Sequence, residues 1–85
     1  MKIVYDNDFD KVLKKLPPDI QKLYKNQEIL FRNNWRDSRL HIKKLINQPF
    51  PFSFRITRAY RVLFVFIAPE TAFFATIAHR KDIYR

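Results

Sequence analysis

The spacing of apolar residues changes part-way along this 85-residue chain, and that change constrains the fold more than any other feature. Before Trp35, apolar residues recur every three or four positions, as they do on one face of a helix. After Trp35 they alternate with polar residues or run together, as they do in strands. A chain this short sustains one hydrophobic core, so we predict a single α+β domain over residues 1–85.

The first half of the chain predicts a short strand and a helical hairpin. Residues 2–5 alternate as a strand does. Pro17 and Pro18 separate two helices, because proline breaks a helix interior but is tolerated in a first turn. Asn33 and Asn34 predict a left-handed end to the second helix. The expected core-facing residues are Phe9, Val12, Leu13 and Leu16 in the first helix and Ile20, Leu23, Tyr24, Leu30 and Phe31 in the second, where Gln27 interrupts the stripe.

The second half predicts three strands joined by tight turns. Residues 52–57 alternate between apolar and polar side chains, and residues 71–77 form another apolar run. Residues 60–67 are apolar on both faces, which is typical of a central strand. Residues 39–45 fit either an extended segment or a short helix. We therefore expect an N-terminal strand and a helical hairpin packed on a mainly antiparallel sheet.

The net charge of +9 indicates a polyanionic partner, whether nucleic acid, anionic lipid or an acidic protein. Residues 1–37 contain eight basic and six acidic side chains, whereas residues 38–85 contain nine basic and two acidic ones. The excess positive charge therefore belongs to the second half. Glycine is absent, which excludes the backbone phosphate cradles that require it. Phosphate binding would have to use side chains.

Several classes of site are excluded by composition. The chain has no cysteine, so it has neither disulfides nor thiolate zinc sites, and a reducing compartment suits it. His41 and His79 stand among scattered carboxylates without a recognisable metal spacing, so we expect no metal and no cofactor. No segment resembles a signal peptide or a membrane span. We expect a cytoplasmic protein without a membrane partner.

Arg61 lies in the middle of the predicted central strand, where charged residues are rare. One interpretation is structural: the guanidinium pairs with a carboxylate or reaches the sheet edge. The other is functional: it lines a concave face and binds phosphate through its planar fork. The sequence alone favours the structural interpretation slightly.

The C-terminal segment contains side chains suited to cleaving RNA without a metal. His79 supplies an imidazole, Arg80 and Lys81 supply cations, and Tyr84 supplies a phenol. In such a reaction the 2′-hydroxyl attacks the adjacent phosphate, a base takes its proton, cations stabilise the phosphorane and an acid protonates the leaving 5′-oxygen. Equally, Tyr84 could merely pack the chain end against the sheet.

A basic group nearer the middle of the chain could follow an RNA backbone, although such charges more often form a solvated face. Its members are Lys43, Lys44, Arg55 and Arg58. Aromatic residues nearby could stack on bases, but their alternation on a strand favours a core position.

These residues carry a resemblance to a known family. The segments are Lys-Lys-Leu-Pro at 14–17, Arg-Leu-His-Ile-Lys-Lys-Leu at 39–45, Phe-Ser-Phe-Arg-Ile at 52–56, Tyr-Arg-Val-Leu-Phe at 60–64 and His-Arg-Lys-Asp-Ile-Tyr at 79–84. With their order, the chain resembles the RelE/ParE superfamily of small toxins from type II toxin–antitoxin systems. The most specific parts are the Tyr-Arg-Val strand and the His-Arg-x-x-x-Tyr ending.

The resemblance implies a role for each matching residue. Arg61 would contact the scissile phosphate, Arg80 would stabilise the transition state, and Tyr84 would activate the 2′-hydroxyl or stack on mRNA. Family members often carry two lysines on the strand before the hairpin, where this chain has Ser53 and Arg55. His79 is an alternative acid or base, since its unperturbed pKa lies near neutrality.

The resemblance also implies a function and two partners. The leading expectation is a toxin that cleaves mRNA in the ribosomal A site as a metal-independent endoribonuclease, held inactive by a cognate antitoxin. One alternative is a ParE-like inhibitor that binds DNA gyrase and cleaves no RNA, because fold alone does not separate the two activities. Another is a non-toxic homologue that only binds its antitoxin.

Overall fold

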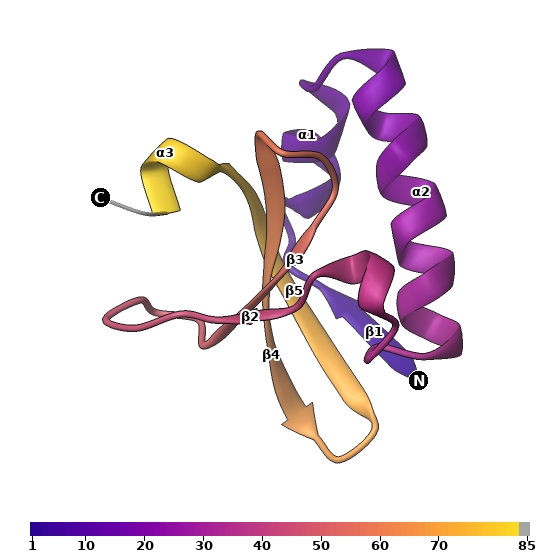
Figure 1. Ribbon diagram of the computed structural model, residues 1–85, viewed down its shortest axis with the longest axis vertical. Coiled ribbons are helices and arrows are strands. Elements are labelled where there is room, and N and C mark those ends of the chain that lie inside the picture. The colour runs from indigo at the N-terminus through magenta and orange to yellow at the C-terminus, as the bar shows by residue number, and fades with distance from the viewer. Residues whose placement is uncertain (84–85) are drawn as a thin grey trace.

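The computed structural model describes residues 1–83, which form one five-stranded sheet with helices on both sides (Figure 1). Its elements in chain order are β1 (Lys2–Tyr5), α1 (Phe9–Lys14), α2 (Pro18–Asn33), the 3-10 helix η1 (Ser38–Leu40), β2 (Lys43–Lys44), β3 (Phe52–Arg55), β4 (Tyr60–Ala68), β5 (Thr71–His79) and α3 (Arg80–Ile83).

The sheet has the strand order β1-β5-β4-β3-β2, so β4 is central as its composition predicts. Strands β2 to β5 pair antiparallel, and β1 pairs parallel with β5. The predicted α+β class, helical hairpin and mainly antiparallel sheet are confirmed. The helices α1 and α2 cover one face of the sheet, whereas α3 lies on the other side (Figure 1).

The core between α2 and the sheet is built around Phe31, which is fully buried. Its ring centroid lies 5.3 Å from that of Phe54 and 5.1 Å from those of Phe64 and Phe74, which belong to three adjacent strands. Edge-to-face and tilted pairs at these separations add to the gain from apolar burial. One helical side chain therefore holds α2 against the centre of the sheet.

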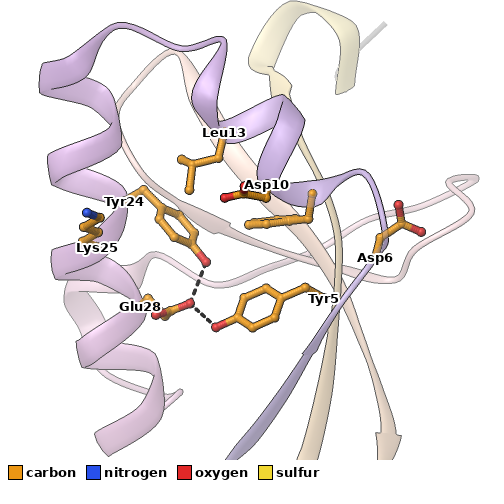
Figure 2. A pocket seen from close by; sticks show the side chains of 8 residues that line it. Tyr5, Asp6, Asp10, Leu13, Tyr24, Lys25 and Glu28 are labelled. Carbon is orange, nitrogen blue, oxygen red and sulfur yellow. Dashed lines mark hydrogen bonds between the residues drawn. The ribbon is translucent and has the colours of Figure 1, made fainter.

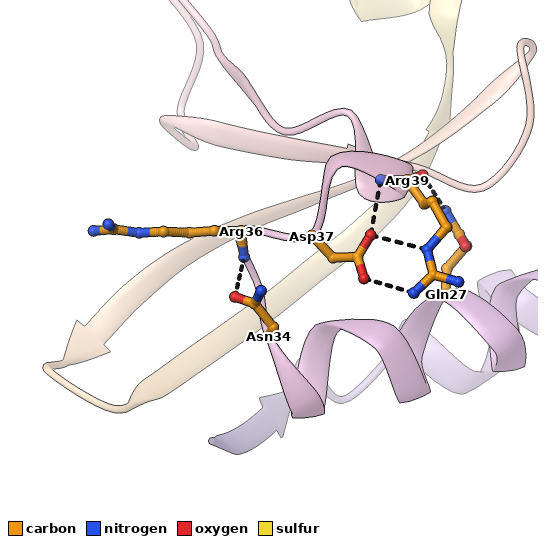
Figure 3. Close-up of polar contacts among 5 residues, drawn as sticks. All are labelled: Gln27, Asn34, Arg36, Asp37 and Arg39. Atoms are coloured by element: carbon orange, nitrogen blue, oxygen red, sulfur yellow. Dashed lines mark hydrogen bonds and ion pairs between the residues drawn. The ribbon is translucent and has the colours of Figure 1, made fainter.

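Two details of the second helix differ from expectation. Leu23, which the periodicity places in the core, is 43% exposed, whereas Tyr24 and Phe31 are buried and Ile20 and Leu30 pack against the core as predicted. The helix ends at Asn33 as predicted, but Asn34 is extended with φ −162° and ψ 100°, not left-handed. Its side-chain oxygen accepts a hydrogen bond from Arg36 N at 3.1 Å (Figure 3), and this local turn replaces the left-handed end.

The structure settles the conformation of residues 39–45 and adds a short helix, α3, at the end of β5. Residues 39–45 turn out to hold both predicted alternatives, because η1 ends at Leu40 and β2 begins at Lys43, with His41 in a left-handed conformation (φ 48°) between them. The helix α3 follows β5 directly and was not predicted. It is tied to the β2–β3 loop, since Gln48 Nε2 donates to Ile83 O at 3.0 Å.

We expect Phe31→Ala to destabilise the protein by about 3–5 kcal/mol, because it removes a fully buried ring from between three strands and leaves a cavity. Urea unfolding followed by circular dichroism measures this cost. Ile29→Ala, at a 57% exposed position of the same helix, is the control and should cost little. An equal effect of the two substitutions would contradict the central role of Phe31.

Candidate functional site

The basic residues of the second half separate according to the sheet register. Arg55 pairs directly with Arg61 across β3 and β4, so the two share a face. The neighbouring pair, Phe54 with Val62, is fully buried under the helices. Because side chains alternate along a strand, the two arginines lie on the face that α1 and α2 do not cover. Lys43, paired with Ser53, joins them there.

A pocket of about 250 Å³ opens on this face, and the residues of the described range that line it are all cationic. Like charges gathered in one hollow raise the local positive potential and attract anions. We call it the cationic pocket. Its lining residues are Lys43, Arg55, Arg58, Arg61 and Arg80.

The tight turn between β3 and β4 brings Arg58 and Arg80 to the rim of this pocket. Thr57 Oγ1 accepts hydrogen bonds from Ala59 N at 3.1 Å and Tyr60 N at 3.3 Å, which fixes the turn that carries Arg58. Arg80 N then donates to Ala59 O at 2.7 Å. The start of α3 is therefore fastened to the β3–β4 turn, and two arginines far apart in sequence meet.

Arg61 is 3% exposed and is held by uncharged oxygens of two neighbouring segments. Its Nε donates to Ser53 Oγ at 2.8 Å, and its Nη2 donates to Ser53 O at 3.4 Å and to His41 O. The left-handed backbone of His41 turns its carbonyl to this position. The hydroxyl and carbonyl oxygens that accept these three hydrogen bonds carry no charge, so the bonds themselves do not neutralise the guanidinium.

Arg55 has a donor that the described part of the chain does not use. Its Nε is buried and meets no hydrogen-bond acceptor within residues 1–83. A buried donor without an acceptor is costly, and such groups are rare in native structures. Since Arg55 lines the cationic pocket, an oxygen of a bound anion would satisfy it.

Gln27, which interrupts the apolar stripe of α2, binds two backbone segments next to the pocket from the opposite face of the sheet. Its side-chain nitrogen Nε2 donates to Arg39 O at 3.0 Å and to Arg55 O at 2.8 Å. Asp37 caps η1 by accepting from Arg39 N at 2.9 Å and forms an ion pair with the Arg39 guanidinium at 2.7 Å (Figure 3). The helix therefore fixes two backbone segments that lead into the pocket.

Three of the predicted site residues within residues 1–83 do not line the pocket. Lys44 pairs with Phe52 and His79 with Tyr60, which places both on the face opposite Arg61, because neighbouring residues of a strand alternate. The His79 ring packs edge-on against Tyr60 at 5.3 Å. Lys81 is exposed on α3. Tyr84 lies outside the described residues.

A second hollow, of about 340 Å³, lies between β1, α1 and α2 (Figure 2). Within it the Glu28 carboxylate accepts hydrogen bonds from the hydroxyls of Tyr24, at 2.8 Å, and Tyr5. Burial and this carboxylate raise the pKa of Tyr24 above its ordinary value. Asp6 and Asp10 also line the hollow, so its charge disfavours anions. The phenol–carboxylate network serves to join β1 to α2.

The described range shows neither a metal site nor a membrane span. No three histidine, cysteine or acidic side chains within residues 1–83 gather closely enough to hold a metal ion. None of the helices in that range has the length and apolar composition needed to cross a bilayer.

Comparison with known proteins adds structural relatives only. No protein-family model matches the sequence, and no curated protein sequence does so either. Among solved structures, the RelB-RelE antitoxin-toxin complex from Methanococcus jannaschii matches with a TM-score of 0.74 and 28% identity over 95% of this chain and 94% of that one. The RelE-RelB complex from Pyrococcus horikoshii OT3 matches with a TM-score of 0.74 and 13% identity over 93% of each chain. YafQ from E. coli also has a TM-score of 0.74, with 11% identity over 99% of this chain and 98% of its own.

The fold and the first of these relatives define the class, which is that of small α+β toxins. Within that class the chain is a RelE-like toxin, matched over nearly its whole length, as the sequence motifs imply. The lower identities of the two other structures support the fold alone.

Sequence reasoning missed the residues that hold the arginines. Ser53 carries the acceptor for Arg61, and the only sequence signal is a small polar residue between two phenylalanines. Gln27 interrupts the apolar stripe of α2, and a polar side chain at such a position indicates that a hydrogen-bond partner lies nearby. The His41 carbonyl has no signal in the sequence, because any residue could supply it.

We expect the Asp37 cap to make stability depend on pH in the acid range. Hydrogen bonds from the Arg39 side chain and backbone lower the pKa of Asp37 to about 2. Because the folded pKa is lowered, the contribution is complete above the unfolded value of about 4 and is lost as the pH falls toward 2. The urea midpoint of wild type should therefore exceed that of Asp37→Asn at pH 6, and the difference should shrink steadily as the pH falls from 4 to 2. A difference that stays constant over this range, or an equal one for Glu70→Gln at an exposed turn, would contradict the assignment.

Proposed function

We propose that this RelE-like toxin cleaves mRNA and that the cationic pocket binds the scissile phosphate. The observation that carries the proposal is the pocket itself, a hollow of about 250 Å³ lined by five cations. The unsatisfied Arg55 Nε supports an anionic ligand with oxygen acceptors. A phosphodiester of RNA supplies both the charge and the acceptors.

The chemistry assigned to the pocket is attack of the RNA 2′-hydroxyl on its own phosphorus. The O2′–P bond forms, the P–O5′ bond breaks, and the products are a 2′,3′-cyclic phosphate and a 5′-hydroxyl end. Negative charge on the phosphate oxygens grows in the transition state, so guanidinium groups aimed at them stabilise it more than the ground state. Arg61 and Arg80 take this role, and DNA, which lacks the nucleophile, is not cut.

The proton transfers require other groups. Arginine keeps its proton in proteins, so the four lining arginines act through charge and hydrogen bonds. Among the described lining residues, Lys43 is the one that is not an arginine and can exchange a proton, and Tyr84 remains the predicted base. His79 is the weaker choice as acid or base, because its side chain leaves the strand on the opposite face from Arg61.

The proposed partners are a translating ribosome, which presents mRNA in its A site, and a cognate antitoxin, both in the cytoplasm. Two of the structural relatives are toxins in complex with antitoxins, which supports an antitoxin for this chain. An acidic, partly disordered antitoxin segment would complement the pocket charge and gain order on binding. A small domain with few proton-transfer groups of its own suits a reaction completed on the ribosome.

The decisive test is induced expression followed by mapping of mRNA 5′ ends on purified ribosomes. We expect wild type to arrest growth and to cut mRNA at codon-phased positions. Arg80→Ala should lower the cleavage rate about 10²- to 10³-fold, as expected for loss of one preorganised donor. Arg36→Ala is the control matched in residue type, since Arg36 lies over the Trp35 ring at 5.1 Å and does not line the pocket.

Three outcomes would contradict this function. Arrest with intact mRNA and inhibited DNA supercoiling would indicate a gyrase inhibitor instead. Cleavage unchanged by Arg80→Ala would remove the pocket from the reaction. Absence of arrest together with tight antitoxin binding would indicate a non-toxic homologue.

A further inference from the structure

We propose that Ser53 is a positioning residue, whose hydroxyl fixes the Arg61 guanidinium in the orientation that serves the cationic pocket. The inference rests on the proposed function for the identity of the ligand, an RNA phosphate. The arrangement of Ser53 and Arg61 stands on the structure.

The contact is buried and specific. Ser53 is fully buried and Arg61 is 3% exposed, so neither exchanges its partner for water without cost. The Ser53 hydroxyl accepts from Nε at 2.8 Å, while Nη2 is bound by the carbonyls of Ser53 and His41. Bonds along the Nε–Nη2 edge of a planar group fix both its position and the tilt of its plane.

The sheet register explains why residue 53 performs this task. Arg61 pairs with Arg55, and Ser53 pairs with Leu63, so Ser53 is the diagonal neighbour of Arg61 on the same face. A long side chain reaches its diagonal neighbour across paired strands. The short side chain of Ser53 brings its hydroxyl within 2.8 Å of Arg61 Nε at this diagonal position.

Positioning affects catalysis more than binding. Without this acceptor the guanidinium keeps its Nη2 bonds but loses the bond at Nε, so the tilt of its plane is less well fixed. Ordering the plane at each turnover would then cost free energy that a fixed donor has already lost on folding. Ground-state attraction of the phosphate depends on the summed charge of five cations and changes little when one of them loses an uncharged acceptor. We therefore expect loss of the hydroxyl to lower kcat and to leave KM within about threefold.

The test compares Ser53→Thr with Ser53→Val, which have the same shape and differ only in the hydroxyl. Thr adds one methyl group at this buried site, and Val adds the same methyl group and carries a second one in place of the hydroxyl, so the packing cost of the added branch is shared. We expect Ser53→Val to reduce kcat for ribosome-bound mRNA about 10- to 100-fold relative to Ser53→Thr, as for one hydrogen bond to a charged group. The Arg61 Nε–H proton should exchange slowly with water in wild type and Ser53→Thr and rapidly in Ser53→Val.

If both variants cleave as wild type does, the hydroxyl is irrelevant to the reaction. If both lose cleavage equally, the position matters only for packing. Either result would overturn the proposal. If Ser53→Val does not fold, Ser53→Ala, which cannot crowd the core, takes its place with the same two readouts against wild type. Failure of the proposed function is separate: no cleavage by wild type contradicts the function, while the Nε–H exchange still decides whether Ser53 holds Arg61. An exchange rate unchanged by loss of the hydroxyl would overturn the positioning role.

Discussion

The guanidinium of Arg61 joins two strands and a turn at one point of the sheet. From β4 it reaches Ser53 on β3 and the carbonyl of His41 between η1 and β2. A charged group in a central strand would be costly without these acceptors, so the segments around it must adopt the register and the left-handed turn that supply them. The cationic pocket lies where these oxygens hold Arg61, on the face that α1 and α2 leave open.

The opposite face of the sheet makes that arrangement possible. Phe31 packs against rings from three strands and closes the core with α2, so the apolar side of each strand is fixed and the polar side faces away. Gln27, on the same helix, bonds the backbone of Arg39 and Arg55. Phe31 holds β3 by packing, and Gln27 holds β3 and the segment before β2 by hydrogen bonds. The helix α2 therefore shapes the pocket although none of its residues lines it.

Much of the fold could be predicted from the sequence, because hydrophobic period and proline position are local signals. They identified the helical hairpin, the central strand and the anomaly of Arg61. The site needed more, since whether Arg55 and Arg61 share a face depends on pairing register, and that is set by turn geometry. The same register separates Lys44 from Lys43 and turns His79 to the face opposite Arg61, while Arg80, at the start of α3, reaches the pocket. Gln27 could not be assigned its acceptors, because they are backbone carbonyls 12 and 28 residues away.

The most direct test of the central claim is to observe the arginine Nε–H signals by NMR while adding a short RNA made uncleavable by a 2′-deoxy sugar, at low salt where phosphate contacts are strong. The signal of Arg55, whose Nε has no acceptor within the described residues, should shift most, with smaller shifts at Arg61 and Arg80. Arg36, outside the pocket, should remain unchanged. Binding of the RNA with an unmoved Arg55 signal, or with an equal shift at Arg36, would contradict the account.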